Sequence, residues 1–151
     1  MIIERAVIGD SEEILSLQKL AYLSEAEIYD DFTIPPLKQT LEEIKKDFEA
    51  QVFLKAVVEE SIIGSVRAYM KEGTCYVGRL IVHPDFQNHG IGKQLMGMIE
   101  EAFKETSRFE IFTGHKSERN LYLYEKLGYR RFKTVPANEK LTIVFLEKRQ
   151  T

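Results

Sequence analysis

The sequence is short of the residues that make disulfides, metal clusters and membrane anchors. It has one cysteine, Cys75, and three histidines, His83, His89 and His115. A single cysteine excludes an internal disulfide and a thiolate metal cluster, and the histidines lack the HxxxH spacing of a helical zinc site. No apolar run approaches the ~20 residues that span a bilayer, and the first residues lack a signal-peptide pattern. We therefore expect a cytoplasmic protein without a metal and without a membrane partner.

The chain also lacks a large excess of charge of either sign. Lys and Arg number 21 and Asp and Glu 24, which gives a net charge of −3. Binding to nucleic acid depends on a basic surface that displaces counterions, so we expect no nucleic-acid partner. Hydrophobic residues make up 44% of the chain, which is enough to form a core and argues against disorder. The length of 151 residues predicts a single domain over residues 1–151.

The first third of the chain predicts one strand and two helices. Residues 2–8 are short and β-branched, as in a strand. At Asp10-Ser11-Glu12-Glu13 a capping side chain precedes two carboxylates, which predicts a helix that continues to about residue 27. Pro35-Pro36 is expected to break the chain, and Thr40-Leu41-Glu42-Glu43 predicts a capping box that opens the second helix.

The rest of the chain predicts a mixed sheet. Three runs rich in Val, Ile, Tyr and Phe are separated by turn-sized gaps and indicate an antiparallel meander, at residues 52–59, 62–71 and 74–83. The following segments predict helix, strand, helix and a final strand pair, at residues 90–105, 108–113, 118–127, 129–136 and 140–147. The fourth and fifth strands are joined through a helix, so they are expected to be parallel. The fold class is α+β, with helices flanking a mostly antiparallel sheet.

The segment from Val82 to Lys93 indicates an anion site. A strand ends, the chain turns at Pro84, and Gly90 and Gly92 open a helix. The first N–H groups of a helix have no intrahelical partner and carry about half a positive charge, while glycine lets a phosphate approach the backbone. Lys93 would add a charged contact. The alternative is a glycine-rich helix start that binds nothing.

Two nucleotide motifs fit this segment less well. A P-loop has glycine five positions before Gly92, where Gln87 stands, and Ser or Thr after Lys93. The dinucleotide fingerprint has a small residue where Leu95 stands. A nucleotide-binding domain that uses Gly90 and Gly92 remains an alternative. Binding of ATP or NAD instead of CoA would distinguish it from a CoA-binding domain.

The same segment resembles the acyl-CoA-binding motif of the GCN5-related N-acetyltransferase (GNAT) superfamily, V-x-P-x-x-[QR]-x-x-G-x-[GA]. Its fixed positions are met by Val82, Pro84, Gln87, Gly90 and Gly92. The resemblance implies splayed fourth and fifth strands, a strand that pairs with the pantetheine arm of acetyl-CoA, and a loop whose N–H groups hold the pyrophosphate. The implied cofactor-binding residues are Leu80, Ile81, Val82, Gln87, Asn88, His89, Gly90, Ile91, Gly92 and Lys93.

A second segment, Asn120 to Tyr129, resembles the family motif LYEKLGF. The resemblance implies that Tyr124 lies near the CoA sulfur and protonates the departing thiolate. A phenol is protonated at neutral pH and suits that role. The alternative is an amphipathic core face. Where many members have an Asn that contacts CoA, this chain has Ser117, so Ser117 and Asn120 are both candidates for that contact.

The general base is harder to identify. The two positions at which family members carry a glutamate are Tyr76 and Phe112 here. His115, a water chain and the acidic residues that follow the first helix remain as candidates. Those acidic residues are Glu25, Glu27, Asp30 and Asp31. The alternatives are a solvated helix end and a loop histidine without a role.

The resemblance implies an N-acetyltransferase, and hence an acyltransferase, that transfers the acetyl group of acetyl-CoA to a primary amine by direct attack. The acceptor is a small molecule or a peptide N-terminus, and the expected acceptor-binding residues are Tyr22, Glu25, Tyr29 and Tyr76. A homodimer is common in the family. The alternative is a catalytically silent module that senses acyl-CoA or binds a protein. Cys75, in a predicted strand, is interpreted as a small buried hydrophobe.

Overall fold

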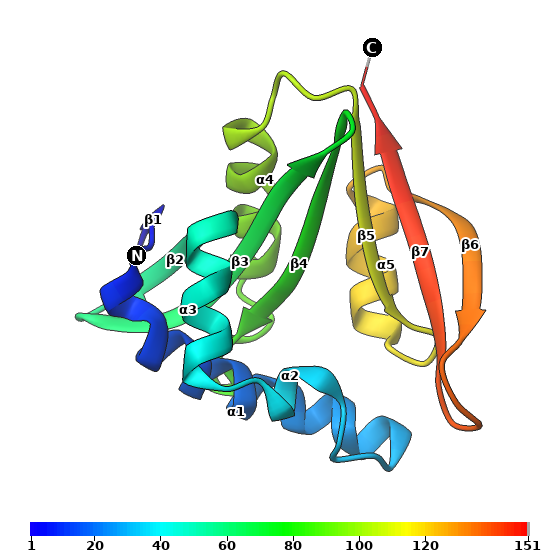
Figure 1. Cartoon of the computed structure of the whole chain (residues 1–151), viewed down its shortest axis with the longest axis horizontal. Helices are drawn as coiled ribbons and strands as arrows, with labels where there is room; N and C mark the ends of the chain where they lie inside the picture. Colours follow the sequence, from blue (N-terminus) through cyan, green and yellow to red (C-terminus); the bar gives the residue numbers. More distant parts are fainter. Residues whose placement is uncertain (151) are drawn as a thin grey trace.

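The computed structural model describes residues 1–150 and contains one seven-stranded mixed sheet with helices on both faces (Figure 1). The strand order is β1-β2-β3-β4-β5-β7-β6. The strands are β1 (Ile2–Arg5), β2 (Val52–Val58), β3 (Ser61–Lys71), β4 (Thr74–Val82), β5 (Arg108–Gly114), β6 (Arg130–Pro136) and β7 (Thr142–Arg149). The β4–β5 pair is parallel and the other pairs are antiparallel, which confirms the expected α+β class.

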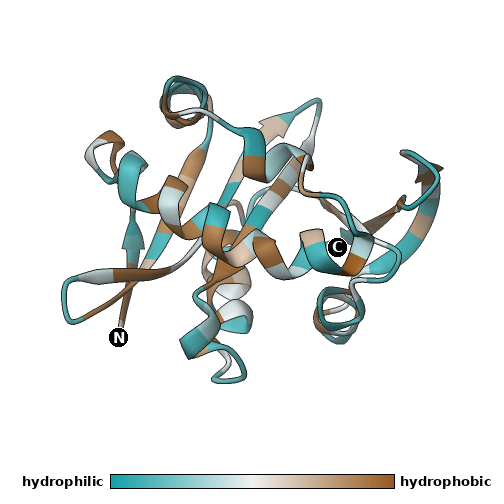
Figure 2. Cartoon of the chain, turned by 90° about the horizontal axis from the view of Figure 1, so that it is seen from below, coloured by the Kyte–Doolittle hydropathy of each residue, from teal (hydrophilic) through white to brown (hydrophobic). Residues whose placement is uncertain are grey.

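The helices divide the core into two layers. They are α1 (Ser11–Tyr29), α2 (Pro35–Lys38), α3 (Leu41–Ala50), α4 (Ile91–Ala102) and α5 (Glu118–Lys126), with 3-10 turns η1 (Ile8–Asp10) and η2 (Pro84–Phe86). Apolar residues of α1 and α3 pack against one sheet face, and those of α4 and α5 against the other. Seen from below, α1 crosses the sheet with apolar and polar residues alternating along it (Figure 2). No helix in residues 1–150 is long and apolar enough to cross a membrane.

Local signals explain most helix boundaries. At Thr40 the capping box is confirmed, because the hydroxyl accepts from Glu43 N at 3.2 Å and Thr40 N donates to the Glu43 carboxylate at 2.9 Å. The predicted helix start is confirmed, with Asp10 as the N-cap residue of α1, but the expected side-chain cap is not formed: the Asp10 carboxylate accepts from Val7 N at η1 instead. Pro35-Pro36 does not simply break the chain but begins the one-turn α2, since proline suits the first helical positions.

Strands β4 and β5 stay together for only a short distance. They pair at Thr74–Arg108, Cys75–Phe109 and Tyr76–Glu110, and then diverge (Figure 1). Beyond this point β4 bulges against β3, with a register shift and a left-handed conformation at Arg79 (φ +49°). A bulge bends its strand and increases its twist, so it turns β4 away from β5. The expected splay of strands four and five is confirmed.

Cys75 is a core residue of β4. It is fully buried among apolar side chains, and burial raises the pKa of its thiol to about 12. The thiolate is the reactive form of cysteine, so this thiol is inert at neutral pH. The interpretation of Cys75 as a small buried hydrophobe is confirmed.

Candidate functional site

A cavity of about 690 Å³ lies where β4 has left β5. Its wall is formed by the C-terminal half of α1, the end of β4, the first turn of α4 and the first two turns of α5. This volume is within the range of sites that hold cofactors and drug-sized ligands. The cavity therefore brings both sequence motifs to one place, together with a helix from the first third of the chain.

Most of the predicted cofactor-binding residues line this cavity. They are Leu80, Ile81, Val82, Gln87, Asn88, Gly90, Ile91, Gly92, Lys93, Ser117 and Asn120. His89 is exposed and is not part of the wall. Of the expected acceptor-binding residues, Tyr22 and Glu25 line the cavity, while Tyr29 and Tyr76 do not.

The N-terminus of α4 opens into the cavity without a side-chain cap. Gly90 is the N-cap residue in a left-handed conformation (φ +77°), and no side chain of residues 1–150 hydrogen-bonds to the N–H groups of the first turn. A Cβ at Gly92 would make an ordinary van der Waals contact with Leu123 Cδ2, at 3.4 Å. The free N–H groups and the helix dipole together favour an anion at this end of the cavity.

Arg119 adds a positive charge that the sequence motifs do not include. It stands in the first turn of α5, lines the cavity and donates a hydrogen bond to the Gln87 side chain. With Lys93 it places two cations beside the uncapped turn of α4. A cation in the first turn of a helix is opposed by the helix dipole, and that mismatch is the signal in the sequence that points to Arg119.

Glu25 is held in the wall by a chain of hydrogen bonds. Its carboxylate accepts from Ser117 Oγ at 2.5 Å and, more weakly, from Asn120 Nδ2 at 3.5 Å. The Tyr29 hydroxyl lies 2.7 Å from Ser117 Oγ and accepts from Lys116 N at 2.9 Å. These contacts join the C-terminal end of α1 to the start of α5 and fix the direction of the Glu25 carboxylate.

Tyr124 is buried behind this wall. The side chain is 3% exposed and packs in the core layer of α4 and α5. Burial raises the pKa of its phenol above the ordinary value, and Tyr22 and Glu25 raise it further. No group in residues 1–150 hydrogen-bonds to the hydroxyl. The phenol is therefore protonated, without a protein partner, and within electrostatic reach of two wall residues.

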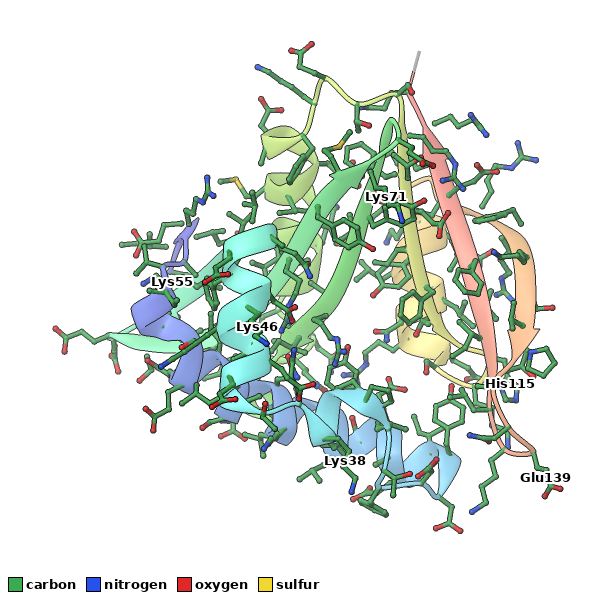
Figure 3. The ribbon with its side chains drawn as sticks, in the orientation of Figure 1. Lys38, Lys46, Lys55, Lys71, His115 and Glu139 are labelled. Carbon is green, nitrogen blue, oxygen red and sulfur yellow. The ribbon has the colours of Figure 1, made fainter. Side chains whose placement is uncertain are left out.

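The structure does not bring His115 to the cavity. Its ring is exposed beside the β6–β7 hairpin (Figure 3), where Nδ1 accepts from Thr142 N at 3.0 Å. Tyr76 stacks on Tyr69 with ring centroids 5.3 Å apart, also outside the wall. Of the candidate bases named from the sequence, Glu25 is the one whose side chain lines the cavity. In residues 1–150 no group of three or more His, Cys, Asp or Glu could hold a metal.

Gly114 has no side chain, and this leaves room for the Tyr29 ring that reaches Ser117. A Cβ at Gly114 would overlap the Tyr29 hydroxyl and would lie 2.5 Å from Tyr29 Cζ and 3.0 Å from Leu141 Cδ1. Gly114→Ala is therefore expected to displace the tyrosine and to lower the free energy of unfolding by about 2–3 kcal/mol. Urea denaturation measures this change.

Gly97→Ala is the matched control for that substitution. Gly97 is exposed on α4, and a Cβ there meets nothing within 4 Å. In a helix interior the same change is expected to stabilise by about 0.5–1 kcal/mol. Equal urea midpoints for the two variants would show that the Tyr29 contact does not support the fold.

The comparisons with known proteins agree with this geometry. The model of the Acetyltransferase (GNAT) family matches residues 13–129. The "UPF0157 protein YqkA" of Bacillus subtilis is 27% identical over 133 residues, which are 88% of this chain and 38% of that protein. "Acetyltransferase YE1169" of Yersinia enterocolitica is 28% identical over 105 residues, covering 67% of this chain and 73% of the relative. The chain thus spans well under half the length of the first of these relatives.

Solved structures share the fold over nearly the whole chain. A PaiA N-acetyltransferase from Thermoplasma acidophilum in complex with coenzyme A has a TM-score of 0.82 at 20% identity, covering 99% of this chain and 100% of that one. The ribosomal-protein-S18-alanine N-acetyltransferase of Escherichia coli has a TM-score of 0.80 at 11% identity, covering 98% and 92%. At such identities the likeness concerns the fold.

Proposed function

Since the chain belongs to the acetyltransferase (GNAT) family, we propose that it is an acyltransferase that transfers the acetyl group of acetyl-CoA to a primary amine. The acceptor is a small molecule or a peptide N-terminus. The observation that carries this proposal is that the uncapped N-terminus of α4 and the Glu25 carboxylate face the same cavity. An anion is favoured at one end, and a group that can accept a proton stands at the other.

The residues of the cavity fit coenzyme A as the donor. The N–H groups of the first α4 turn are free to hold its diphosphate, and Lys93 and Arg119 are placed to neutralise it. Beyond Tyr76 the edge of β4 has no pairing with β5, so its backbone groups are free to pair with an extended arm. One of these N–H groups would polarise the thioester carbonyl as an oxyanion donor.

Glu25 is the residue that we assign to the incoming amine. Ser117 and Asn120 hold its carboxylate in the wall, so that it can bind an ammonium group and accept a proton from it. The neutral amine then attacks the thioester carbon, a C–N bond forms and the C–S bond breaks. The carboxylate returns the accepted proton to solvent.

Tyr124 is the residue that we assign to the departing thiolate. From the neutral amine, the overall transfer moves one proton from the attacking nitrogen to the sulfur. We assign to the protonated phenol the donation to that sulfur, and the proton that the nitrogen sheds as the C–N bond forms restores the phenol. Burial raises the pKa of Tyr124, so the phenol holds its proton at neutral pH and has one to donate.

Ligand-dependent thermal unfolding tests the donor assignment. Coenzyme A and acetyl-CoA are expected to raise the Tm, since a ligand at 100 times its Kd stabilises by about 2.7 kcal/mol. ATP and NAD serve as comparison ligands, and protection by either of them without protection by coenzyme A would contradict the assignment. Thiol release from acetyl-CoA with a panel of amines then tests transfer. Tight binding of acetyl-CoA without acetylation of any amine would favour a silent sensing module.

A further inference from the structure

Two arginines are close in the β3–β4 pairing, where Arg67 stands opposite Gly78 and Arg79 follows Gly78. Arg67 of β3 is 5% exposed, and its guanidinium lies over the Phe53 ring at 4.4 Å. It donates to Gln18 of α1 at 2.5 Å and to Asp47 of α3 at 2.9 Å. Arg67 therefore has a full set of neighbours and a carboxylate partner, as a buried cation requires.

Arg79 of β4 lacks hydrogen-bond partners of this kind in the described residues. Its Nη1 is the one buried side-chain nitrogen or oxygen in residues 1–150 without a hydrogen-bond partner. A buried donor left unpaired is costly, and in native proteins it commonly marks a place for a ligand, an ion or a water molecule. Arg79 also has a left-handed backbone (φ +49°), which is unfavourable for a side chain without glycine's freedom. The β4 bulge accounts for this backbone conformation, so it is the unpaired donor that indicates a demand other than packing at this position.

The charge around the two arginines is not balanced. Asp47 is the carboxylate that pairs with Arg67, and its Oδ2 also accepts from Gln39. Burial and the charge of Arg79 lower the pKa of Arg67 to about 10, as expected for two guanidiniums that are close to each other. An anion placed against Arg79 would relieve this repulsion and satisfy the unpaired donor together.

Tyr22 connects Arg79 with the candidate site. Tyr22 and Glu25 stand three residues apart on α1 and both line the cavity. The Tyr22 phenol is within electrostatic reach of both Arg79 and Glu25, since their charges shift its pKa in opposite directions. Arg79 itself is not in the cavity wall, and its side chain is half-buried. Tyr22 is thus close to one positive and one negative group.

We propose that Arg79, with Arg67 behind it, binds an oxyanion carried by the acceptor amine, so that the acceptor is a small amine bearing a carboxylate, as in an amino acid, or a phosphate. The inference rests on the proposed function, because it assigns the ammonium group of the same acceptor to Glu25. It narrows the acceptor class: an amine that carries only positive charge satisfies Glu25 and leaves Arg79 unpaired.

Matched acceptor pairs test this assignment with wild-type protein alone. Thiol release from acetyl-CoA is measured for L-amino acids and their carboxamides, and for O-phosphoethanolamine and ethanolamine. The carboxylate or phosphate member of a pair is expected to have a kcat/KM about tenfold higher or more, because the neutral member leaves the buried Nη1 of Arg79 unpaired. The two kinds of pair distinguish a carboxylate from a phosphate. Equal or higher rates with the neutral members would overturn the proposal.

The Arg79→Gln variant tests whether Arg79 causes the preference for acceptors that carry a carboxylate or a phosphate. The variant is expected to lose the discrimination within each pair while coenzyme A raises its Tm as in the wild type. Arg79→Lys keeps the charge without the bidentate geometry and is expected to show an intermediate preference. Arg5→Gln removes the same charge from exposed β1 and is the control, with the preference unchanged. Full discrimination in Arg79→Gln would overturn the assignment.

Equilibrium binding separates this inference from the proposed transfer activity. N-acetyl-L-amino acids and their amides are added to the coenzyme A-loaded protein, and the Tm is measured. Acetylation of no amine at all would refute the proposed function, and the subsite would then be judged by protection alone. Protection by the carboxylates that is lost in Arg79→Gln supports the subsite, and protection that is absent or equal in the two proteins overturns it.

Discussion

Tyr124→Phe is expected to lower kcat by about 10²- to 10³-fold, because the variant lacks the proton that the departing thiolate takes up. The substitution removes only a hydroxyl to which no group in residues 1–150 hydrogen-bonds, so the fold should keep its packing. The Tm increase with coenzyme A is therefore expected to match that of the wild type. Single-turnover thiol release with a saturating acceptor is the measurement, since it isolates the chemical step from product release.

Tyr122→Phe is the matched control on the same helix. Tyr122 is 68% exposed and lies on the cavity rim, with Lys126 Nζ 5.6 Å from its ring centroid. Loss of its hydroxyl is expected to change kcat by less than about twofold. Equal kcat values for the Tyr124 and Tyr122 variants would remove Tyr124 from the chemical step. A loss of coenzyme A binding confined to Tyr124→Phe would instead assign it a structural role.

Glu25→Gln is expected to lower kcat/KM by about 10²-fold or more, because an amide neither attracts an ammonium group nor accepts its proton. The glutamine retains the size of the glutamate and an oxygen that can accept from Ser117, so the join between α1 and α5 should persist. The dependence of kcat/KM on pH adds a second readout. A variant without the base should recover part of its rate at high pH, where the amine is already neutral.

Glu27→Gln is the control for the general effect of charge. Glu27 lies two residues further along α1, is exposed and is not part of the cavity wall. The same change of charge there is expected to leave kcat/KM within about twofold. If Glu25→Gln and Glu27→Gln behave alike, the base is a water molecule or another group, and the role of Glu25 is limited to joining the helices.

The fold and the donor end of the site follow from signals that are local in the sequence. The segment Val82–Lys93 holds its turn, its two glycines and its cation within one strand end and one helix start, so reading it requires no tertiary contact. The capping box at Thr40 is equally local. The Asp10 side chain does not cap α1, because its carboxylate accepts from Val7 N in the preceding 3-10 turn. Which of these two bonds forms depends on the residues before Asp10.

The acceptor end depends on contacts between distant parts of the chain. Glu25 and Ser117 are 92 residues apart, and only the packing of α1 against the start of α5 distinguishes Glu25 from its acidic neighbours. His115 was equally attractive by sequence, yet it faces the β6–β7 hairpin. The unpaired Nη1 of Arg79 is likewise a property of the folded chain and has no signal in the sequence.

The brief parallel contact between β4 and β5 has a mechanical consequence. Three residue pairs at one end of these strands connect the half of the sheet that contains β1 to β4 with the half that contains β5 to β7. At the other end the halves are tied by Glu25 and Tyr29 of α1, through Ser117. The gap between β4 and β5 is thus bounded by backbone pairing at Tyr76 and by side-chain hydrogen bonds at Ser117. A molecule that binds to both sides of this gap adds contacts between the two halves, so occupancy of the site is expected to raise the rigidity of the whole sheet.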